Sequence, residues 1–145
     1  MNSFFSIVLA LAIMCSGYSN PGVNTEGTPI PSVMSGLAED DTLKVSIHAT
    51  KEKNSLLYKT KITFTNKTNT GIDLIFDCGS LISSASISKG DICPAVYSML
   101  LKKSSTEEKV GMYDKNFFEG RTLSVTYEQE EGVRKVLEIK LKAKK

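Results

Sequence analysis

Hydrophobic and polar side chains alternate along most of the chain beyond residue 42. The alternation is clear in five stretches, residues 43–49, 56–65, 72–78, 122–127 and 133–142. A period of two places successive side chains on opposite faces, which is typical of half-buried β-strands. Turn-forming residues recur between these stretches about every 8–12 residues, a spacing typical of an all-β sandwich.

The middle of the chain is less regular. Residues 95–101 form a short apolar run that suits a strand or a short buried helix, and its neighbours favour a strand. Residues 102–109 and 114–120 are polar, and we expect two loops there, with Phe117 and Phe118 packing at the base of the second. The body of the chain therefore predicts an all-β, antiparallel immunoglobulin-like β-sandwich of about seven strands.

The chain begins with an apolar run over residues 4–15 that departs from this pattern. A helix that spans a bilayer needs about 20 apolar residues, whereas a run of about 10–14 suits the core of a secretory signal peptide. We therefore expect residues 1–15 to be a signal peptide, although no Lys or Arg precedes the run. The alternative is a buried N-terminal strand or helix, which the Gly-, Ser- and Pro-rich sequence that follows disfavours.

Cys15 ends the apolar run and is followed by Ser16 and Gly17. This arrangement resembles the bacterial lipoprotein signal, in which a cysteine after the apolar core is lipidated and becomes the mature N-terminus. That motif usually has Leu three residues before the cysteine and a small residue directly before it, where this chain has Ala12 and Met14. The resemblance implies a lipid anchor on Cys15, and simple cleavage a few residues further on is the alternative.

Residues 16–42 contain four Gly and three Pro among many Ser, Thr and Asn residues. They show no sustained period, so we predict a flexible linker with an r.m.s. reach of roughly 30 Å. The predicted organisation is a signal peptide over residues 1–15, a linker over 16–42 and one sandwich domain over 43–145. The protein is then exported, and it is either anchored at the outer face of the cell membrane or secreted.

Two cysteines remain once Cys15 is assigned to the leader. An exported protein meets oxidising conditions, so we expect a disulfide between Cys78 and Cys93. Closing this loop of about 16 residues is worth on the order of 3 kcal/mol in the chain-entropy model. Two inert buried thiols are the alternative, because one histidine and no C-x-x-C pair give little basis for a metal site or a catalytic cysteine.

Composition and charge exclude several classes of protein. The 145 residues are 41% hydrophobic and 23% charged, which is ordinary for a globular domain and unlike a disordered chain. A net charge of +2 gives no support for nucleic-acid binding. All 18 Lys and Arg residues lie from Lys44 onwards, and residues 134–145 are strongly basic. This last stretch suits contact with anionic lipid or cell-wall polymer, or else a solvated strand face, which we favour.

The first half of the domain resembles a known family. Residues 46–49 (SIHA), 64–68 (FTNKT) and 72–79 (IDLIFDCG) are similar to the first strands of the BsuPI-like domain, the bacterial intracellular proteinase inhibitor family. Residues 117–127 and 132–142 look like the last two strands of such sandwiches. The resemblance implies an immunoglobulin-like sandwich and, as an alternative function, a secreted proteinase inhibitor. It transfers no site, because no inhibitory residue of that family is matched here.

The sequence contains none of the motifs G-x-S-x-G, G-x-x-x-x-G-K, G-x-G-x-x-G or H-E-x-x-H. We therefore expect a non-enzymatic, monomeric binding module of the cell envelope, without cofactor or metal, whose partner is a protein or another envelope component. The candidate binding residues, in segment 81–95 and loop 114–120, are Leu81, Ile82, Asp91, Phe117 and Phe118. The alternative is that these loops only stabilise the domain, with the two phenylalanines in its core. His48 is expected to be an ordinary surface residue.

Overall fold

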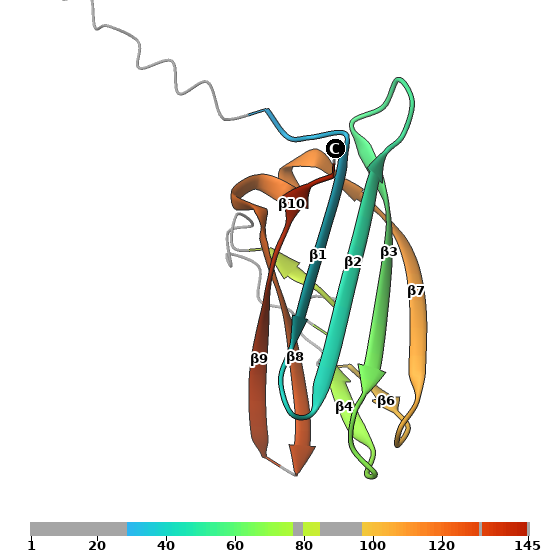
Figure 1. Ribbon diagram of the computed structural model, residues 1–145, viewed down its shortest axis with the longest axis vertical. Coiled ribbons are helices and arrows are strands. Elements are labelled where there is room, and N and C mark those ends of the chain that lie inside the picture. Colours follow the sequence, from blue (N-terminus) through green and yellow to red (C-terminus); the bar gives the residue numbers. More distant parts are fainter. Residues whose placement is uncertain (1–28, 77–79, 85–96, 131, 145) are drawn as a thin grey trace, which may run out of the picture.

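Two antiparallel sheets pack face to face in the protein (Figure 1). The computed structural model describes residues 29–76, 80–84, 97–130 and 132–144. Strands supply most of these residues, and the inward side chains of both sheets form one hydrophobic core. The predicted fold class, an antiparallel immunoglobulin-like β-sandwich, is therefore confirmed.

The first sheet has the strand order β10-β1-β2-β3-β7. Its strands are β1 (Val33–Glu39), β2 (Leu43–Lys51), β3 (Leu57–Asn66), β7 (Thr106–Asp114) and β10 (Lys142–Ala143). The alternation read from the sequence sets its central part, because β2 and β3 bury every second residue and expose the others. Strand β7 lies at one edge, where it pairs with β3.

The second sheet has the order β5-β8-β4-β6, with β9 paired to β8. Its strands are β4 (Ile72–Ile75), β5 (Ser83–Ser84), β6 (Ser98–Leu101), β8 (Thr122–Glu130) and β9 (Val133–Lys140). The 3-10 helix η1 (Lys115–Arg121) connects β7 to β8 and brings the chain from the first sheet to the second. Residues 98–101, predicted as strand or short helix, are thus a strand.

Two segments differ from the prediction. Residues 33–39 were predicted as part of the flexible linker over 16–42, but they form β1, which pairs along its whole length with β2. Its core-facing positions after Met34 are Gly36 and Ala38, and these small residues conceal the alternation. Residues 106–109 were predicted as part of a charged loop, but they begin β7, an edge strand whose side chains are mostly exposed.

Strands β9 and β10 join the two sheets along one edge of the sandwich. Strand β9 pairs with β8 in the second sheet, and after the buried Leu141 the chain continues as β10 beside β1 in the first. The Leu141 amide donates to the Arg121 carbonyl at 2.7 Å, and the Lys144 amide donates to the Val33 carbonyl at 3.1 Å. This crossing holds the N-terminal strand between β10 and β2.

Gly36 lies where β1 passes closest to β9. A Cβ atom there would lie 2.8 Å from Ile139 Cγ2 and 2.8 Å from the Lys140 carbonyl oxygen. We therefore expect Gly36→Ala to lower the free energy of unfolding by about 1–3 kcal/mol, because the backbone cannot yield as a side chain can. Gly71→Ala is the matched control, since its nearest atom is the tip of the exposed Leu100 side chain. Urea unfolding of both variants measures the difference, and equal costs would contradict the close approach.

A hydrogen bond between Asp40 and Tyr127 joins the two sheets at the end of the sandwich where β1 turns into β2. The Tyr127 hydroxyl donates to Asp40 Oδ2 at 2.6 Å, and Asp40 Oδ1 accepts from the amides of Thr42 and Leu43 at 2.8 Å each. Burial alone would raise the pKa of Asp40, but these three donors lower it below its usual value. Burial and the adjacent carboxylate raise the pKa of Tyr127 to about 12.

Tyr127→Phe should therefore lower the free energy of unfolding by an amount that depends on pH. Because the pKa of Asp40 is lower in the folded state, its stabilisation is present above the unfolded pKa of about 3.9 and is lost as the pH falls. We expect the variant to lose about 1–2 kcal/mol at pH 7, and the difference from the parent to shrink below pH 4. Unfolding curves recorded from pH 7 to pH 3 test this, and a difference that stays constant would rule out the ionised Asp40 as the acceptor.

Candidate binding surface

Four of the residues expected to form a binding surface lie in the core instead. Leu81 is 9% exposed, Ile82 1%, Phe117 8% and Phe118 0%. The two phenylalanines lie in η1 and point between the sheets, where their rings contact Tyr58 and Tyr113. Their role in the described structure is packing, because these side chains are covered by neighbouring strands rather than offered to a partner.

The remaining residues singled out in the sequence lie outside the described part of the chain. These are Cys15, Cys78, Asp91 and Cys93. The lipid anchor and the disulfide therefore stay predictions.

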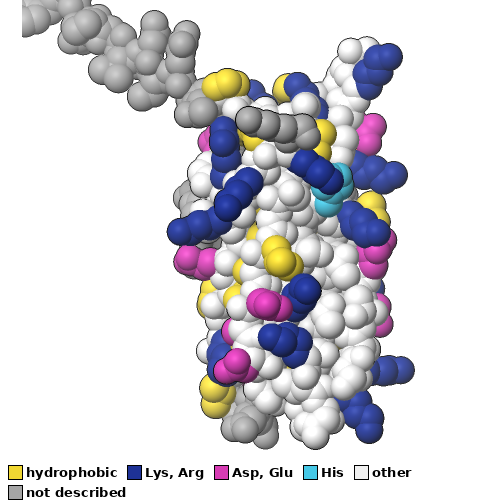
Figure 2. Space-filling model, viewed as in Figure 1, with side chains coloured by type: hydrophobic (Ala, Val, Ile, Leu, Met, Phe, Trp, Pro, Cys, Tyr) yellow, Lys and Arg dark blue, Asp and Glu magenta, His cyan; other side chains and the backbone are white. Residues whose placement is uncertain are grey.

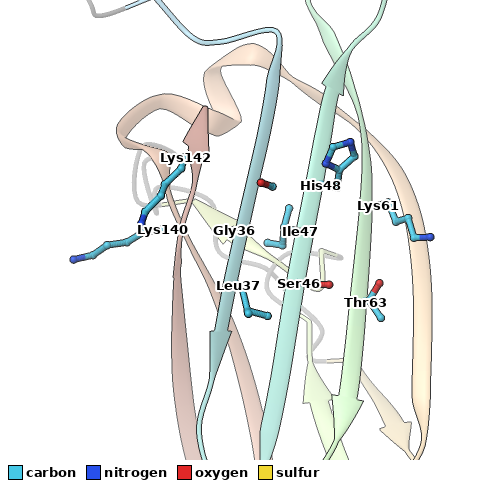
Figure 3. Close-up of a pocket in the computed structure, with 10 residues that line it drawn as sticks. Gly36, Leu37, Ser46, Ile47, His48, Lys61, Thr63, Lys140 and Lys142 are labelled. Carbon is cyan, nitrogen blue, oxygen red and sulfur yellow. The ribbon is translucent and has the colours of Figure 1, made fainter. Parts of the chain in front are cut away.

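An open depression of about 510 Å³ lies on the outer face of the first sheet (Figure 3). Strand register assembles it from four neighbouring strands. In one cross-strand row, Lys142 of β10 lies opposite Ser35 of β1, which lies opposite His48 of β2, which lies opposite Lys61 of β3. The next row places Leu37, Ser46 and Thr63 side by side. We call this surface the sheet-face depression; its lining also includes Gly36, Ile47 and Lys140.

Three hydroxyl groups form the floor of the sheet-face depression. Ser35, Ser46 and Thr63 are half-buried between longer side chains on adjacent strands. Within the described residues, none of these three hydroxyls has a hydrogen-bond partner in the protein. Each hydroxyl can both donate and accept a hydrogen bond, so all three remain available to a ligand.

The rim of the depression is cationic. Its lining contains Lys61, Lys140, Lys142 and His48, and no Asp or Glu. Lys61 extends toward β7, where its Nζ lies 2.6 Å from Glu108 Oε2 (Figure 3). Lys140 and Lys142 have no ion pair among the residues that the structure describes. The His48 ring stands on the exposed side of β2, with Nε2 3.4 Å from Thr50 Oγ1. The depression therefore favours ligands with negative charge.

Other kinds of site are not found in the described ranges. They contain no group of three or more His, Cys, Asp or Glu residues placed to hold a metal ion. No helix in this part of the chain is long and apolar enough to cross a membrane. The fold and its surface thus define an antiparallel β-sandwich with a polar, acid-free depression on one sheet. Comparison with known protein families, curated proteins and solved structures found no match for the chain.

The sheet-face depression is not visible in the sequence, for a structural reason. The alternation over residues 43–49 predicts that Ser46 and His48 face outward from one strand. Ser35 and Leu37 fall in the predicted linker, so the strand that completes the surface was not predicted. An outward-facing row of hydroxyl residues on neighbouring strands would have been the useful signal, but it depends on the register between strands.

Proposed function

We propose that the chain is an exported, lipid-anchored, non-enzymatic binding module of the bacterial cell envelope, and that its sheet-face depression binds an anionic envelope component. The observation that carries the proposal is the composition of the depression: three unused hydroxyls between lysines, with no carboxylate in the lining. Oxygen-rich anions accept hydrogen bonds from hydroxyl and ammonium groups together, and charge-assisted bonds are the stronger ones.

The chemistry of the depression supports binding rather than catalysis. A nucleophilic hydroxyl needs a base within hydrogen-bond reach and a third group that orients this base. His48 lies 3.4 Å from the Thr50 hydroxyl, and both residues are exposed on one strand. A long contact on an open sheet face gives no protection from water and no fixed orientation.

The anchor is tested by the intact mass of the processed protein from its native host. A diacylglyceryl adduct on Cys15, with a mass lower by two hydrogen atoms for a bridge between Cys78 and Cys93, would support export and anchoring. A retained leader with free thiols would contradict both.

Ser46→Glu tests the binding surface, because it places a carboxylate on the floor of the depression. With heparin as a polyanionic probe, we expect binding at least about tenfold weaker than that of the parent, which corresponds to about 1.4 kcal/mol. Ser98→Glu adds the same charge to an exposed residue of β6 in the other sheet and serves as the control. Titration calorimetry at fixed salt measures both, and thermal unfolding shows that each variant is folded. Equal weakening by the two variants would exclude the depression as the site.

A further inference from the structure

The end of the sandwich where the chain enters the fold is a single surface built from several loops. It comprises residues 29–32, the β2–β3 hairpin over 51–57, η1 and residues 142–144, and we call it the chain-entry end (Figure 1). Backbone hydrogen bonds tie these parts together: the Lys51 amide donates to the Ser32 carbonyl at 2.7 Å, and the Lys115 amide donates to the Leu56 carbonyl at 2.9 Å. An open hollow of about 910 Å³ lies between the loops.

Positive charge collects at the chain-entry end. Its cations are Lys51, Lys53, Lys115, Arg121, Lys142 and Lys144, and its acids, with the adjoining last residue of β7, are Glu52, Asp114 and Glu119. Lys51, Lys115 and Arg121 converge on the hollow, where the Arg121 Nη2 also donates to the Pro29 carbonyl at 3.2 Å. Figure 2 shows the Lys and Arg side chains gathered over the upper half of the visible face, which includes this end. On the lower half of the same face, Lys and Arg side chains lie among Asp and Glu side chains (Figure 2).

Apolar side chains are exposed beside these cations. Leu56 is 56% exposed and Leu57 40% exposed, both in the β2–β3 hairpin. Leu56 also lines the hollow, next to Lys51 and Lys115. Exposed aliphatic residues among lysines suit the interface of an anionic bilayer, where the side chains enter the headgroup region and the ammonium groups meet phosphate.

The number of residues between Cys15 and the chain-entry end limits how far this end can lie from a lipid on Cys15. About 13 residues of the predicted linker separate Cys15 from Pro29, which gives an r.m.s. reach of about 20 Å. A lipid on Cys15 would therefore hold the chain-entry end close to the bilayer, and the other end of the sandwich would point away.

We propose that the chain-entry end is a membrane-facing surface that docks on anionic lipid headgroups, with Leu56 and Leu57 entering the interface. The geometry rests on the proposed function, since it takes Cys15 as the anchor. Docking orients the sandwich upright on the bilayer. The sheet-face depression then faces sideways, parallel to the plane of the membrane, where an envelope component can reach it.

The chain contains no Trp, so a single introduced Trp reports on one position. Leu56→Trp places the reporter in the hairpin, and Val133→Trp places it on a residue of similar exposure (51%) at the opposite end of the sandwich. The full processed protein, in both lipidated and lipid-free form, is mixed with vesicles of phosphatidylcholine containing 30% phosphatidylglycerol and brominated acyl chains. We expect a blue shift and quenching for Leu56→Trp, little change for Val133→Trp, and a loss of the effect in pure phosphatidylcholine.

Charge-reversal variants show whether vesicle binding depends on the chain-entry end or only on the overall positive charge of the protein. Lys53→Glu with Lys115→Glu should reduce the partition of the lipid-free protein into anionic vesicles at least tenfold, whereas Lys102→Glu with Lys103→Glu, in the β6–β7 turn at the opposite end, should leave it nearly unchanged. Equal quenching of the two Trp variants, or binding to soluble heparin at this end without binding to vesicles, would overturn the proposal. If the intact mass shows no lipid on Cys15, the proposed function fails, and the lipid-free measurement still decides this proposal.

Discussion

Replacing Phe118 by alanine is expected to lower the free energy of unfolding by about 3–5 kcal/mol. The side chain is fully buried, and its ring centroid lies 5.0 Å from that of Tyr58 and 5.4 Å from that of Phe117. The truncation removes aromatic contacts and leaves a cavity where η1 packs between the sheets. Chemical denaturation, with circular dichroism as the signal, measures the loss.

Phe118→Leu is the matched control, because it keeps most of the buried volume and should cost clearly less than the alanine variant. The two substitutions also decide between the two interpretations of this loop that the sequence allowed. If Phe118→Ala left stability nearly unchanged and abolished binding of the heparin probe, the residue would be a binding residue rather than part of the core.

Asn66→Ala should lower the free energy of unfolding by about 2–4 kcal/mol, which is unusual for a polar residue at the end of a strand. Asn66 is 2% exposed, and its Nδ2 lies 2.7 Å from the Thr70 carbonyl oxygen and 3.0 Å from that of Lys102. Its Oδ1 accepts from the Thr68 amide at 2.8 Å and from the Thr68 hydroxyl at 2.7 Å. One side chain thus forms hydrogen bonds with groups of both the turn after β3 and the turn before β7. Its removal leaves buried polar groups without partners.

Asn69→Ala, in the turn that follows Asn66, is the control, since Asn69 is exposed. We expect it to change the unfolding free energy by less than about 0.5 kcal/mol. Urea unfolding of the two variants under identical conditions measures the contrast. Similar values for both would mean that the amide network does not hold the two turns together.

The sequence predicted those strands whose two faces differ. In β2 from Leu43 to Thr50, and in β3 from Tyr58 onwards, outward residues are polar and inward residues are buried, so the period of two is visible directly. Strand β1 was not predicted because its inward positions after Met34 hold Gly36 and Ala38, which hide the alternation, and at Gly36 a Cβ atom would lie within 2.8 Å of β9. Strand β7 was not predicted from its pattern because it lies at the edge of the sheet and most of its side chains are exposed.

The candidate surfaces could not be predicted in the same way. The sheet-face depression combines Ser35, His48, Thr63 and Lys142, which lie far apart along the chain and meet only through the register of four strands. The chain-entry end likewise depends on which loops share one end of the sandwich. Local patterning fixes which side of a strand a residue occupies, whereas the neighbours across strands follow from topology.

The position of β1 between β10 and β2 has a mechanical consequence. The chain enters at one end of the sandwich and β1 runs directly away from it, so tension on the linker acts along the axis of this strand. Antiparallel hydrogen bonds lie across the strand direction. When a partner holds the face of the first sheet, such tension therefore shears all the bonds between β1 and β2 at the same time, rather than opening them one after another. The N-terminal strand is placed to bear load.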